Sequence, residues 1–598
     1  MWQASAKGRS PAEVREGENV TTVIWERAAR TPDRQIIAYR DGETWQQVTW
    51  STLAERVERL AAGLIAEGVG VGDRVALMSS TRVEWTYLDL AILAAGGVTV
   101  PIYETSSTDQ CAWILEDSGA CLLLAETADQ AKRLDQARPE GTDAPLFVIE
   151  DGGLDALAER GGIDEREQVA DRAAAASLDD PFSIIYTSGT TGRPKGCVLT
   201  HRNLLFTARQ TELVLKELLQ ADESSTLMFL PLAHVLARLI QYVCLESDTV
   251  MGYAGSIETL ADDLKSFKPV WVLSVPRVFE KIFNGAQRKA EGPKRKVFDF
   301  AVANAQEWSA AVDAGRDPGL LTKAKHQVAK RLVYAKLREA LGGRIEFCVS
   351  GGAPLAPYLA HFFHAAGIDI YEGYGLTETT APATVNSPRA RRIGTVGTPL
   401  PGMEVAIADD GEIMIRGDSV FTKYWNNEEA GKEILLEDGW CASGDLGEIA
   451  DGFLRVTGRK KEMIVTAGGK NVAPAVLEER IKANRLVSQV LVVGEGRPFV
   501  GALITLEPDE VEAFAREHDL GDRSMEELAQ SDEVRAELDR AVQQANDAVS
   551  QAESVRQFAV LPRDLTVDDG ELTPSLKVRR HVVLEHFPDQ VEQLYERS

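Results

Sequence analysis

The stretch YTSGTTGRPKG at residues 186–196 combines hydroxyl side chains, glycines and two cations in a pattern that suits a phosphate group. Glycine lets a backbone approach a bulky anion, and hydroxyl groups, backbone N–H groups and the charges of Arg193 and Lys195 can surround the phosphate oxygens. A simple polar turn is the alternative interpretation. The apolar run at residues 181–185 predicts a buried strand just before the stretch. We therefore expect a phosphate-binding loop at the end of a strand.

This loop differs from the G-x-x-x-x-G-K-[ST] phosphate loop. Gly196 follows Lys195 at the place where that motif has a serine or threonine for magnesium. Pro194 also disfavours a helix through Lys195. The sequence therefore predicts a nucleotide loop of another type.

The composition of the chain restricts the classes of function. With 598 residues the chain is too long for one hydrophobic core, so two or more domains are expected. There are 65 Lys and Arg against 92 Asp and Glu, and the net charge of -27 argues against general nucleic-acid binding. Hydrophobic residues make up 44% of the chain, which excludes global disorder. An anionic substrate would need a local cationic pocket.

The cysteines, the histidines and the N-terminus give further limits. The six cysteines form no C-x-x-C pair and the eight histidines show no ligand spacing, so the sequence does not support a structural zinc site. We expect reduced, mostly buried thiols. The N-terminus has no apolar signal core, and the longest uncharged apolar-rich segment, residues 90–103, is too short to span a bilayer. A cytoplasmic protein is expected.

Alternating apolar runs and helical patterns predict the elements that hold the loop. From Gly72 the sequence indicates a strand, a helix that begins near Thr81 and stops at Gly96 and Gly97, and a second strand, which together form a βαβ unit. Further apolar runs lie at residues 121–124, 146–149, 183–186, 270–275 and 345–350. We predict an α/β fold with mostly parallel sheets and with ligand loops at the carboxyl ends of the strands.

Two later regions depart from this α/β pattern. Residues 404–456 contain short alternating strands around an Asp-Asp-Gly turn, which indicates a β-rich subdomain. The chain then continues with a helix opened by Pro474, two strands and acidic helices, which indicate a smaller α+β domain. We place the domain boundary near residue 458, with a large N-terminal domain at 1–458 and a small C-terminal domain at 459–598.

Residues 277–338 oppose the acidic balance of the chain, with 14 Lys or Arg against 6 Asp or Glu. They include the amphipathic sequence KAKHQVAKRLVYAKLREAL. A solvated helical face explains this pattern, and peripheral contact with an anionic membrane or a phosphorylated partner is the alternative.

Six motifs follow the glycine-rich loop in order along the chain. They are LPLAH (230–234), SGGAPL (350–355), YEGYGLTE (371–378), SGDLG (443–447), GRKKEMIVTAGGKNV (458–472) and LTPSLK (572–577). Each motif is weak alone, but their ordered co-occurrence is specific. The set resembles the adenylate-forming superfamily of acyl-CoA synthetases, adenylation domains and beetle luciferases. It is most similar to the long-chain fatty acid CoA ligases, over about residues 20–590.

The resemblance implies a two-step reaction. ATP activates a long-chain fatty acid to acyl-AMP with release of pyrophosphate, and the acyl group then passes to CoA. ATP, magnesium and CoA as co-substrate are implied, together with a mobile C-terminal domain. Carboxylate and polyphosphate repel each other, so catalysis must neutralise charge and align the reactants.

The resemblance also assigns a nucleotide site. The residues that match the phosphate cradle are Thr187, Ser188, Gly189, Thr190, Thr191, Gly192 and Lys195. The residues that match the adenine pocket are Gly351, Gly352, Ala353, Tyr374 and Gly375, with Tyr374 against the base. Core packing is the alternative role for Tyr374.

Further matching residues surround the phosphates and the ribose. Glu378 matches the carboxylate that helps to hold magnesium, which prefers hard oxygen ligands, and Thr377 matches a donor to the α-phosphate. Asp445 matches the acid that accepts hydrogen bonds from both ribose hydroxyls. Arg459 matches a cation near the ribose and α-phosphate, and Lys461 matches the hinge. A solvated surface charge and a turn aspartate are the alternatives for Glu378 and Asp445.

The C-terminal motifs match residues that act in turn. Lys577 matches the lysine that bridges the substrate carboxylate and the nucleotide, although Leu576 stands where many relatives have glycine. In the family, the small domain then rotates, so that this lysine leaves and a glycine-bearing loop lines the pantetheine tunnel. Gly468 and Gly469 match that loop, and a structural turn is their alternative role.

The acyl site is defined less sharply by the sequence. His234 matches a residue beside the acyl group, and either acyl lining or ordinary core is expected for Val235, Leu236, Leu239, Ile240 and Tyr242. Three rival functions stay open at this point. They are a fatty acyl-AMP ligase or adenylation enzyme that loads a carrier protein, a luciferase-like oxygenase, and a non-catalytic lipid-binding protein.

Overall fold

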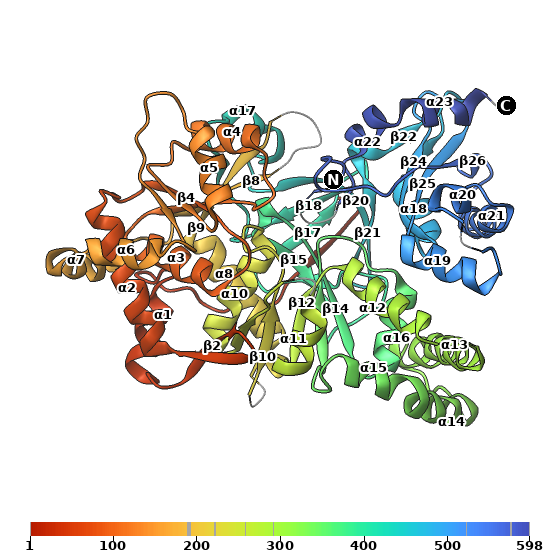
Figure 1. Ribbon diagram of the computed structural model, residues 1–598, viewed down its shortest axis with the longest axis horizontal. Coiled ribbons are helices and arrows are strands. Elements are labelled where there is room, and N and C mark those ends of the chain that lie inside the picture. The colour runs from red at the N-terminus through yellow and green to blue at the C-terminus, as the bar shows by residue number, and fades with distance from the viewer. Residues whose placement is uncertain are drawn as a thin grey trace.

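The computed structural model describes residues 2–187, 193–220, 223–256, 259–290, 292–521, 523–573 and 577–596. A first large sheet carries the predicted βαβ unit and the strand before the glycine-rich loop (Figure 1). Its spatial order is β19 (Lys423–Tyr424), β9 (Lys195–Thr200), β8 (Pro181–Thr187), β5 (Val98–Ile102), β4 (Arg74–Met78), β6 (Leu122–Ala125) and β7 (Leu146–Val148). The strands from β8 to β7 are parallel, and β9 and β19 are antiparallel additions.

A second large sheet stands beside the first. Its spatial order is β16 (Thr398–Pro399), β15 (Ala381–Val385), β14 (Asp369–Leu376), β13 (Phe347–Ser350), β12 (Trp271–Ser274), β10 (Ser225–Met228), β11 (Val250–Tyr253), β2 (Gln35–Asp41) and β3 (Thr44–Thr49). The strands from β14 to β2 are parallel, and the edges are antiparallel. The prediction of an α/β fold with mostly parallel sheets is confirmed.

Apolar side chains from both sheets share one core with the helices packed between them. The helices of this core are α2 (Trp50–Ala66), α3 (Val83–Ala94), α8 (His201–Val214) and α10 (Val235–Ser247). Other helices before residue 300 are α1 (Thr22–Arg30), α4 (Thr108–Ser118), α5 (Ala128–Gln136), α6 (Gly153–Arg160), α7 (Ile163–Ala175), α9 (Lys216–Leu219), α11 (Leu260–Phe267), α12 (Pro276–Arg288) and α13 (Pro293–Asp313). All six cysteines are free, and all but Cys121 are buried, as expected.

A buried ion pair joins α3, α10 and β8 within this core. Arg238 contacts the carboxylate of Asp89, and neither side chain is more than 1% exposed. Arg238 also donates to the Ser183 hydroxyl at 2.5 Å, and Tyr242 donates to Asp89 at 3.1 Å. Removal of one partner would leave an uncompensated buried charge, which costs about 3–5 kcal/mol. The network therefore fixes β8, which leads into the glycine-rich loop, against α10.

The predicted helix start near Thr81 is confirmed to within two residues. Helix α3 begins at Val83, and Thr81 does not cap it. The Thr81 hydroxyl instead donates to Leu230 O at 2.7 Å and accepts from Leu232 N at 3.2 Å. A tertiary contact has taken the side chain that local sequence assigned to the helix, and it holds the LPLAH segment in place.

The predicted β-rich subdomain is an antiparallel sheet. Its order is β1 (Ala4–Lys7), β17 (Glu404–Ile407), β18 (Glu412–Arg416), β20 (Cys441–Ala450) and β21 (Phe453–Arg459). Strand β1 comes from the N-terminus, which the sequence did not indicate. The remaining elements of the large domain are α14 (Leu320–Ala329), the π-helical turn η1 (Lys330–Tyr334), α15 (Ala335–Ala340), α16 (Pro357–Ala365), η2 (Thr377–Thr379) and α17 (Glu428–Ile434).

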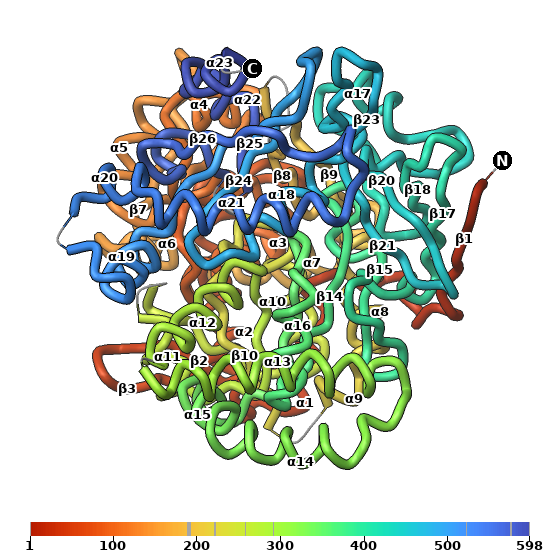
Figure 2. Tube along the Cα trace, turned by 90° about the vertical axis from the view of Figure 1, so that its right-hand side faces the viewer, coloured from red at the N-terminus to blue at the C-terminus, as the bar shows by residue number. Residues whose placement is uncertain are grey.

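The C-terminal elements form a smaller α+β unit with its own apolar core. They are η3 (Lys460–Glu462), β22 (Ile464–Val465), β23 (Asn471–Val472), α18 (Pro474–Lys482), β24 (Val487–Val493), β25 (Val500–Leu506), α19 (Pro508–Glu517), α20 (Met525–Ala529), α21 (Asp532–Asn546), β26 (Val555–Val560), α22 (Arg580–His586) and α23 (Pro588–Glu596). The helix at Pro474, the two strands and the acidic helices are confirmed. Figure 2 shows this unit in the upper part of the molecule.

Ion pairs connect the C-terminal unit to α12 of the large domain. Arg277 contacts Glu507, and Arg288 Nη1 lies 2.8 Å from Asp509 Oδ2. Such partly exposed pairs each contribute little free energy, so they are compatible with a unit that moves. In the described part of the chain, no helix is long and apolar enough to cross a membrane.

Candidate active site

A cleft of about 2090 Å³ brings together side chains from both large sheets, the β-rich sheet and the C-terminal unit. Most of the predicted site residues that the structure describes line it, namely Thr187, Lys195, His234, Gly351, Gly352, Ala353, Tyr374, Gly375, Thr377, Glu378, Asp445, Arg459, Lys461 and Lys577. The predicted residues Ser188, Gly189, Thr190, Thr191 and Gly192 lie outside the described residues. Residues hundreds of positions apart in sequence therefore share one space.

The glycine-rich stretch connects two antiparallel strands, because Thr187 at the end of β8 lies opposite Lys195 at the start of β9. A strand rather than a helix follows the loop, in agreement with the prediction from Pro194. Trp113 on α4 supports its far end, where its Nε1 donates to Pro194 O at 2.8 Å and its ring lies 4.6 Å from the Arg193 guanidinium. Lys195 is thus held at a strand start and directed toward the cleft.

Tyr424 links two predicted phosphate-site residues. Its hydroxyl donates to Glu378 Oε1 at 2.6 Å, and the Lys195 ammonium lies 5.3 Å from the centre of its ring. The backbone just after Glu378 has positive φ at two residues that are not glycine, Thr380 (53°) and Ala381 (69°). Such backbone strain occurs where the surrounding structure imposes it, often at functional sites. Sequence reasoning missed Tyr424, which no spacing rule connects to Glu378.

Asp445 and Arg459 lie directly opposite each other on β20 and β21. Across an antiparallel pair this brings side chains into contact, and Arg459 Nε lies 3.0 Å from Asp445 Oδ1. The Tyr374 hydroxyl donates to the other carboxylate oxygen at 2.7 Å. Burial and the nearby Asp445 carboxylate raise the pKa of Tyr374 far above its ordinary value. Asp445 is buried with both oxygens oriented by neighbours.

Lys577 enters the cleft from the C-terminal unit. Two hydrogen bonds to Thr573 hold its backbone, because its N–H donates to Thr573 Oγ1 at 3.0 Å and its carbonyl accepts from Thr573 N at 2.8 Å. Its side chain keeps contact with solvent. The cleft walls nevertheless dehydrate the ammonium, and with the charge of Arg459 they lower the pKa of Lys577, while Asp445 and Glu378 oppose this shift.

His234 caps α10 at the same cleft, since its Nδ1 accepts from Leu236 N at 3.2 Å. Burial, and secondly the charge of Lys577, lower the pKa of His234 to about 4. The imidazole is therefore neutral near pH 7, and with Nδ1 as acceptor its proton is on Nε2. Among the residues expected near the acyl group, Val235, Leu236, Leu239 and Ile240 line the cleft. Tyr242 does not, because its hydroxyl binds Asp89 in the core.

Close contacts explain two glycines that line the cleft, Gly351 and Gly375. A Cβ at Gly375 would lie 1.8 Å from Ala381 O, and a Cβ at Gly351 would lie 3.0 Å from Leu236 Cδ2. A register shift between Tyr374 and Gly375 bends β14 at this point. Such bulges re-aim side chains beside active sites.

Glu372 is a further cleft residue that sequence reasoning missed. It accepts from Leu355 N at 3.3 Å, just after the Gly351–Gly352–Ala353 turn. Burial, with a smaller contribution from Glu479, raises the pKa of Glu372 to about 8. Residues two apart on a strand share a face, so the position of Glu372 two before Tyr374 was a usable signal.

Gly468 and Gly469 are not among the residues that line the cleft. They form the turn between β22 and β23, where Gly469 has φ +75° and Gly469 N donates to Thr466 O at 2.8 Å. In this arrangement Lys577, rather than the glycine loop, faces the cleft. Lys461, in the short helix η3 between the large sheets and the C-terminal unit, also lines it.

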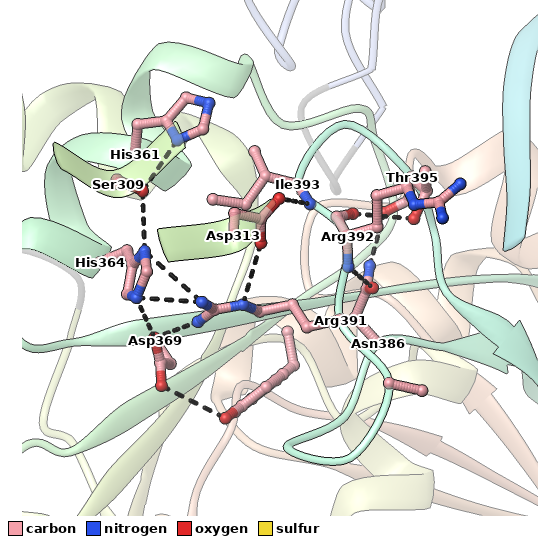
Figure 3. A network of polar contacts seen from close by, with 12 residues as sticks. Ser309, Asp313, His361, His364, Asp369, Asn386, Arg391, Arg392, Ile393 and Thr395 are labelled. Carbon is pink, nitrogen blue, oxygen red and sulfur yellow. Dashed lines mark hydrogen bonds and ion pairs between the residues drawn. The ribbon is translucent and has the colours of Figure 1, made fainter. Parts of the chain in front are cut away.

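A polar network fixes another wall of the cleft, residues 394–396 (Figure 3). Arg391 contacts Asp369 at the start of β14, and its Nε lies 3.4 Å from Asp313 Oδ1 on α13. Asp313 Oδ2 accepts from Ile393 N at 3.1 Å. Ser309, also on α13, lies 2.7 Å from His364 Nδ1. The segment that follows β15 is therefore tied to α13, α16 and β14.

Among the side chains that the structure describes, no group of three or more His, Cys, Asp or Glu could hold a metal ion by itself. A magnesium ion at Glu378 would therefore need phosphate or water oxygens as its other ligands. Tyr424 occupies one oxygen of Glu378, and the carboxylate is a hard ligand of the kind that magnesium prefers.

Comparison with known proteins agrees with the convergence of these motifs. The sequence model of the AMP-binding enzyme family matches residues 24–425, and that of the AMP-binding enzyme C-terminal domain matches residues 461–598. Two curated relatives, both named long-chain-fatty-acid–CoA ligase FadD15, come from Mycobacterium bovis and Mycobacterium tuberculosis. They are 48% and 47% identical over 598 residues, which cover 98% of this chain and 99% of each relative.

A solved structure of similar fold is the anthranilate CoA ligase AuaEII in complex with anthranoyl-AMP. Its TM-score is 0.73 at 18% identity, with 95% of this chain and 97% of that chain covered. At this identity the similarity establishes the fold alone. The large α/β domain and smaller C-terminal domain are thus shared with a structure solved independently.

Proposed function

The chain belongs to the AMP-binding enzyme family, and from this membership we propose that it activates a long-chain fatty acid with ATP and transfers the acyl group to CoA. In the first step a carboxylate oxygen attacks the α-phosphorus, and the bond to pyrophosphate breaks. In the second step the CoA thiolate attacks the acyl carbon, and AMP leaves. The convergence of Lys195, Glu378, Asp445 and Lys577 on one cleft supports this proposal most directly.

Lys195 and the glycine-rich loop bind the β- and γ-phosphates in this proposal. The chain carries a net charge of -27, so its field repels a polyphosphate until local cations offset it. Lys195, Arg459 and Lys577 provide those cations within the cleft. Thr377 donates to the α-phosphate, and Glu378 would hold the magnesium ion that neutralises phosphate charge when bound.

Asp445 accepts hydrogen bonds from the two ribose hydroxyls, because its carboxylate is buried and already oriented by Tyr374 and Arg459. The base lies between Tyr374 and the turn at Gly351, Gly352 and Ala353, where glycine leaves room for it. Arg459 reaches the ribose and the α-phosphate from the end of β21.

Lys577 acts in the first step. Its ammonium lies between the substrate carboxylate and the α-phosphate oxygens, and it offsets the charge that develops as the acyl phosphate bond forms. Its hydrogen bond to Thr573 orients it from the C-terminal unit. Because Lys577 belongs to the C-terminal unit, rotation of that unit would carry it out of the cleft after the first step.

Rotation about Lys461 exchanges Lys577 for the turn at Gly468 and Gly469, which then lines the path of the pantetheine arm. We also propose a domain boundary near residue 458, because η3 directly follows the last strand of the β-rich sheet and leads into the C-terminal unit. The short turn between β22 and β23 carries no bulky side chain at its two glycines, which leaves space for a thiol arm.

The long acyl chain extends from His234 along the apolar face of α10. Val235, Leu236, Leu239 and Ile240 line the cleft there, and each buried methylene contributes about 0.8 kcal/mol. The neutral His234 places an N–H donor and no charge beside the acyl group.

A combined pyrophosphate-release and thioester assay across acids of graded length tests the proposal. We expect pyrophosphate release with long-chain acids, followed by acyl-CoA when CoA is added. Acyl-AMP that persists in the presence of CoA would favour the carrier-loading alternative. No pyrophosphate release with short, long or aromatic acids would refute the enzyme function and favour a lipid-binding protein.

A further inference from the structure

One end of the molecule exposes apolar side chains that the fold does not bury. On α14 and η1, Leu320, Leu321, Val328 and Leu332 are 88%, 70%, 48% and 48% exposed. Leu321, Val328 and Leu332 are separated by seven and four residues, a spacing that keeps them near one face of a helix, and Leu320 stands beside them at the helix start. We call these four residues the apolar stripe.

The opposite face of these helices is already packed. Thr322, His326, Ala329 and Tyr334 are buried. The His326 ring stacks on Trp308 with centroids 4.2 Å apart, and the Tyr334 hydroxyl donates to Ala301 O at 2.7 Å. These helices therefore already bury one face against the core, and the apolar stripe lies on the face that remains exposed in the folded molecule.

Basic side chains flank the apolar stripe. Lys323, Lys330 and Arg331 are exposed on the same helices, and Lys336 is exposed on α15. Lys323 pairs with Asp317 at 2.8 Å. Within the described part of the chain, Lys330, Arg331 and Lys336 form no ion pair, so their charges are directed to solvent.

A hollow of about 500 Å³ lies beside η1 and α15, and its lining includes Lys330, which stands between Val328 and Leu332 in the chain. It is lined by Lys265, Lys268, Lys330 and Arg338, with Glu339 as its acidic residue. Lys265 pairs with Asp262 at 3.3 Å, and Arg338 donates to Gly367 O at 2.5 Å, so these two cations also serve the fold. Lys268 and Lys330 have no ion pair among the described residues, which leaves two uncompensated charges facing the hollow.

This surface lies at one end of the molecule, where it is accessible to a flat anionic surface. In Figures 1 and 2 the helix α14 lies at the lower end of the molecule, and the C-terminal unit lies in the upper part. Charges separated by more than about 8 Å are largely screened at physiological ionic strength. An anionic surface that approaches the lower end therefore meets the local basic excess of residues 277–338 rather than the net charge of -27.

We propose that the apolar stripe and the basic hollow form a docking site for an anionic lipid bilayer. The apolar stripe inserts at the level of the headgroups, and Lys268 and Lys330 bind lipid phosphates in the hollow. An amphipathic helix with basic flanks binds membranes in this way, through apolar burial and attraction to anionic lipids. The choice of a lipid surface over another anionic partner rests on the proposed function, since a membrane is where long acyl chains partition.

Vesicle flotation of the full chain tests this proposal. Vesicles of phosphatidylcholine with about one third phosphatidylglycerol are compared with pure phosphatidylcholine, at low and high salt. We expect the protein to float with the anionic vesicles at low salt and to be released by high salt. Absence of flotation with anionic vesicles, or equal flotation with both compositions, would overturn the proposal.

Two double variants separate the two parts of the surface. Leu320→Ser with Leu321→Ser removes the most exposed apolar side chains, and Lys268→Glu with Lys330→Glu reverses the charge of the hollow. Each is expected to lower the bound fraction by about tenfold or more, because several apolar methylenes or charges are lost. Unchanged binding of either variant would contradict the assigned site.

Matched controls lie far from this end of the molecule. Val71→Ser with Ile163→Ser removes side chains that are 74% and 77% exposed, and Lys132→Glu with Arg166→Glu makes the same charge change on α5 and α7. The controls should keep full binding, and equal loss in them would overturn the site. A different result would overturn the proposal in favour of contact between copies of this chain. In that case the wild type does not float with vesicles, and the variant Leu320→Ser with Leu321→Ser elutes at a different apparent size in gel filtration.

Failure of the docking site can be told apart from failure of the proposed function. The docking variants are assayed for thioester formation with a short, water-soluble acid and without vesicles. Wild-type rates together with lost flotation support the docking site. Flotation of a wild type that is inactive with every acid would refute the proposed function and leave the docking site standing.

Discussion

The Tyr424 hydroxyl donates a hydrogen bond of 2.6 Å to Glu378, and the same tyrosine ring lies 5.3 Å from the Lys195 ammonium. Tyr424 comes from β19, the antiparallel strand at the edge of the first sheet, whereas Glu378 follows β14 of the second sheet. A single side chain thus connects the two sheets at the place where the phosphates are expected to bind. This makes Tyr424 a positioning residue for Glu378 rather than a catalytic one.

Tyr424→Phe should weaken the use of ATP and magnesium. A hydrogen bond to a charged group contributes about 1.5–3 kcal/mol, which corresponds to a 10- to 100-fold loss in kcat/KM for ATP. The loss should appear chiefly as a higher magnesium requirement, because Glu378 is no longer held in one orientation. Titration of pyrophosphate release with magnesium measures it. Tyr39→Phe, on β2 and outside the cleft, is the control, and an unchanged magnesium curve in Tyr424→Phe would contradict the assignment.

Lys577→Ala should separate the two half-reactions. Acyl-AMP formation should fall by at least about 10²-fold, because the charge that offsets the developing acyl phosphate is lost. Thioester formation from supplied acyl-AMP should continue, because the proposed second step does not use this lysine. Burst measurements of pyrophosphate and direct assay of acyl-CoA from acyl-AMP give the two rates. Equal loss of both steps would contradict the division of roles.

Lys461→Pro should slow the second step more than the first. Lys461 lies in η3, between the last strand of the β-rich sheet and the C-terminal unit, and proline restricts φ and removes a backbone N–H there. Lys577 already faces the cleft in the observed arrangement, so adenylation needs no rotation. Single-turnover rates for the two steps test this. A variant that makes thioester at the wild-type rate would remove the hinge assignment.

Much of the fold follows from local pattern. Parallel strands such as β5, β6 and β12 are short runs of buried residues with a strong sequence signal, whereas β10, which is half Ser and Thr, was not predicted. Strand β1 does not, because Ala4–Lys7 is a polar segment that becomes a strand only by pairing with β17. Thr81 shows the same effect at a helix end, where a contact with Leu230 replaces capping.

The candidate site was predictable where residues lie in ordered motifs. The fold brings four residues from such motifs to one cleft, namely Lys195, Glu378, Asp445 and Lys577. Tyr424 and Glu372 were missed for different reasons. Tyr424 reaches Glu378 only through tertiary pairing of β19 with β9, whereas Glu372 shares a strand face with Tyr374 and could have been found from that alternation.

Glu372→Gln should change how stability depends on pH. Burial raises the pKa of Glu372 to about 8 in the folded chain, against an ordinary value of 4.5. The carboxyl group therefore stays protonated after folding while the unfolded chain ionises, so stability is lost as pH rises from about 4.5 to about 8. Glutamine does not ionise and keeps a similar shape. The variant should thus unfold at a temperature close to that of the wild type at pH 5 and at a higher temperature at pH 8.5, by up to a few kcal/mol in free energy.

The measurement compares thermal unfolding midpoints of wild type and variant at the two pH values. Glu478→Gln is a poor control, because Glu478 pairs with Arg580, whereas Glu167→Gln on α7 changes an exposed carboxylate of the same kind. If the difference between Glu372→Gln and wild type is the same at pH 5 and pH 8.5, the carboxyl group is not protonated in the folded chain. A compensating cation or water would then have to reach Glu372, and the dehydration by which burial raises its pKa would be contradicted.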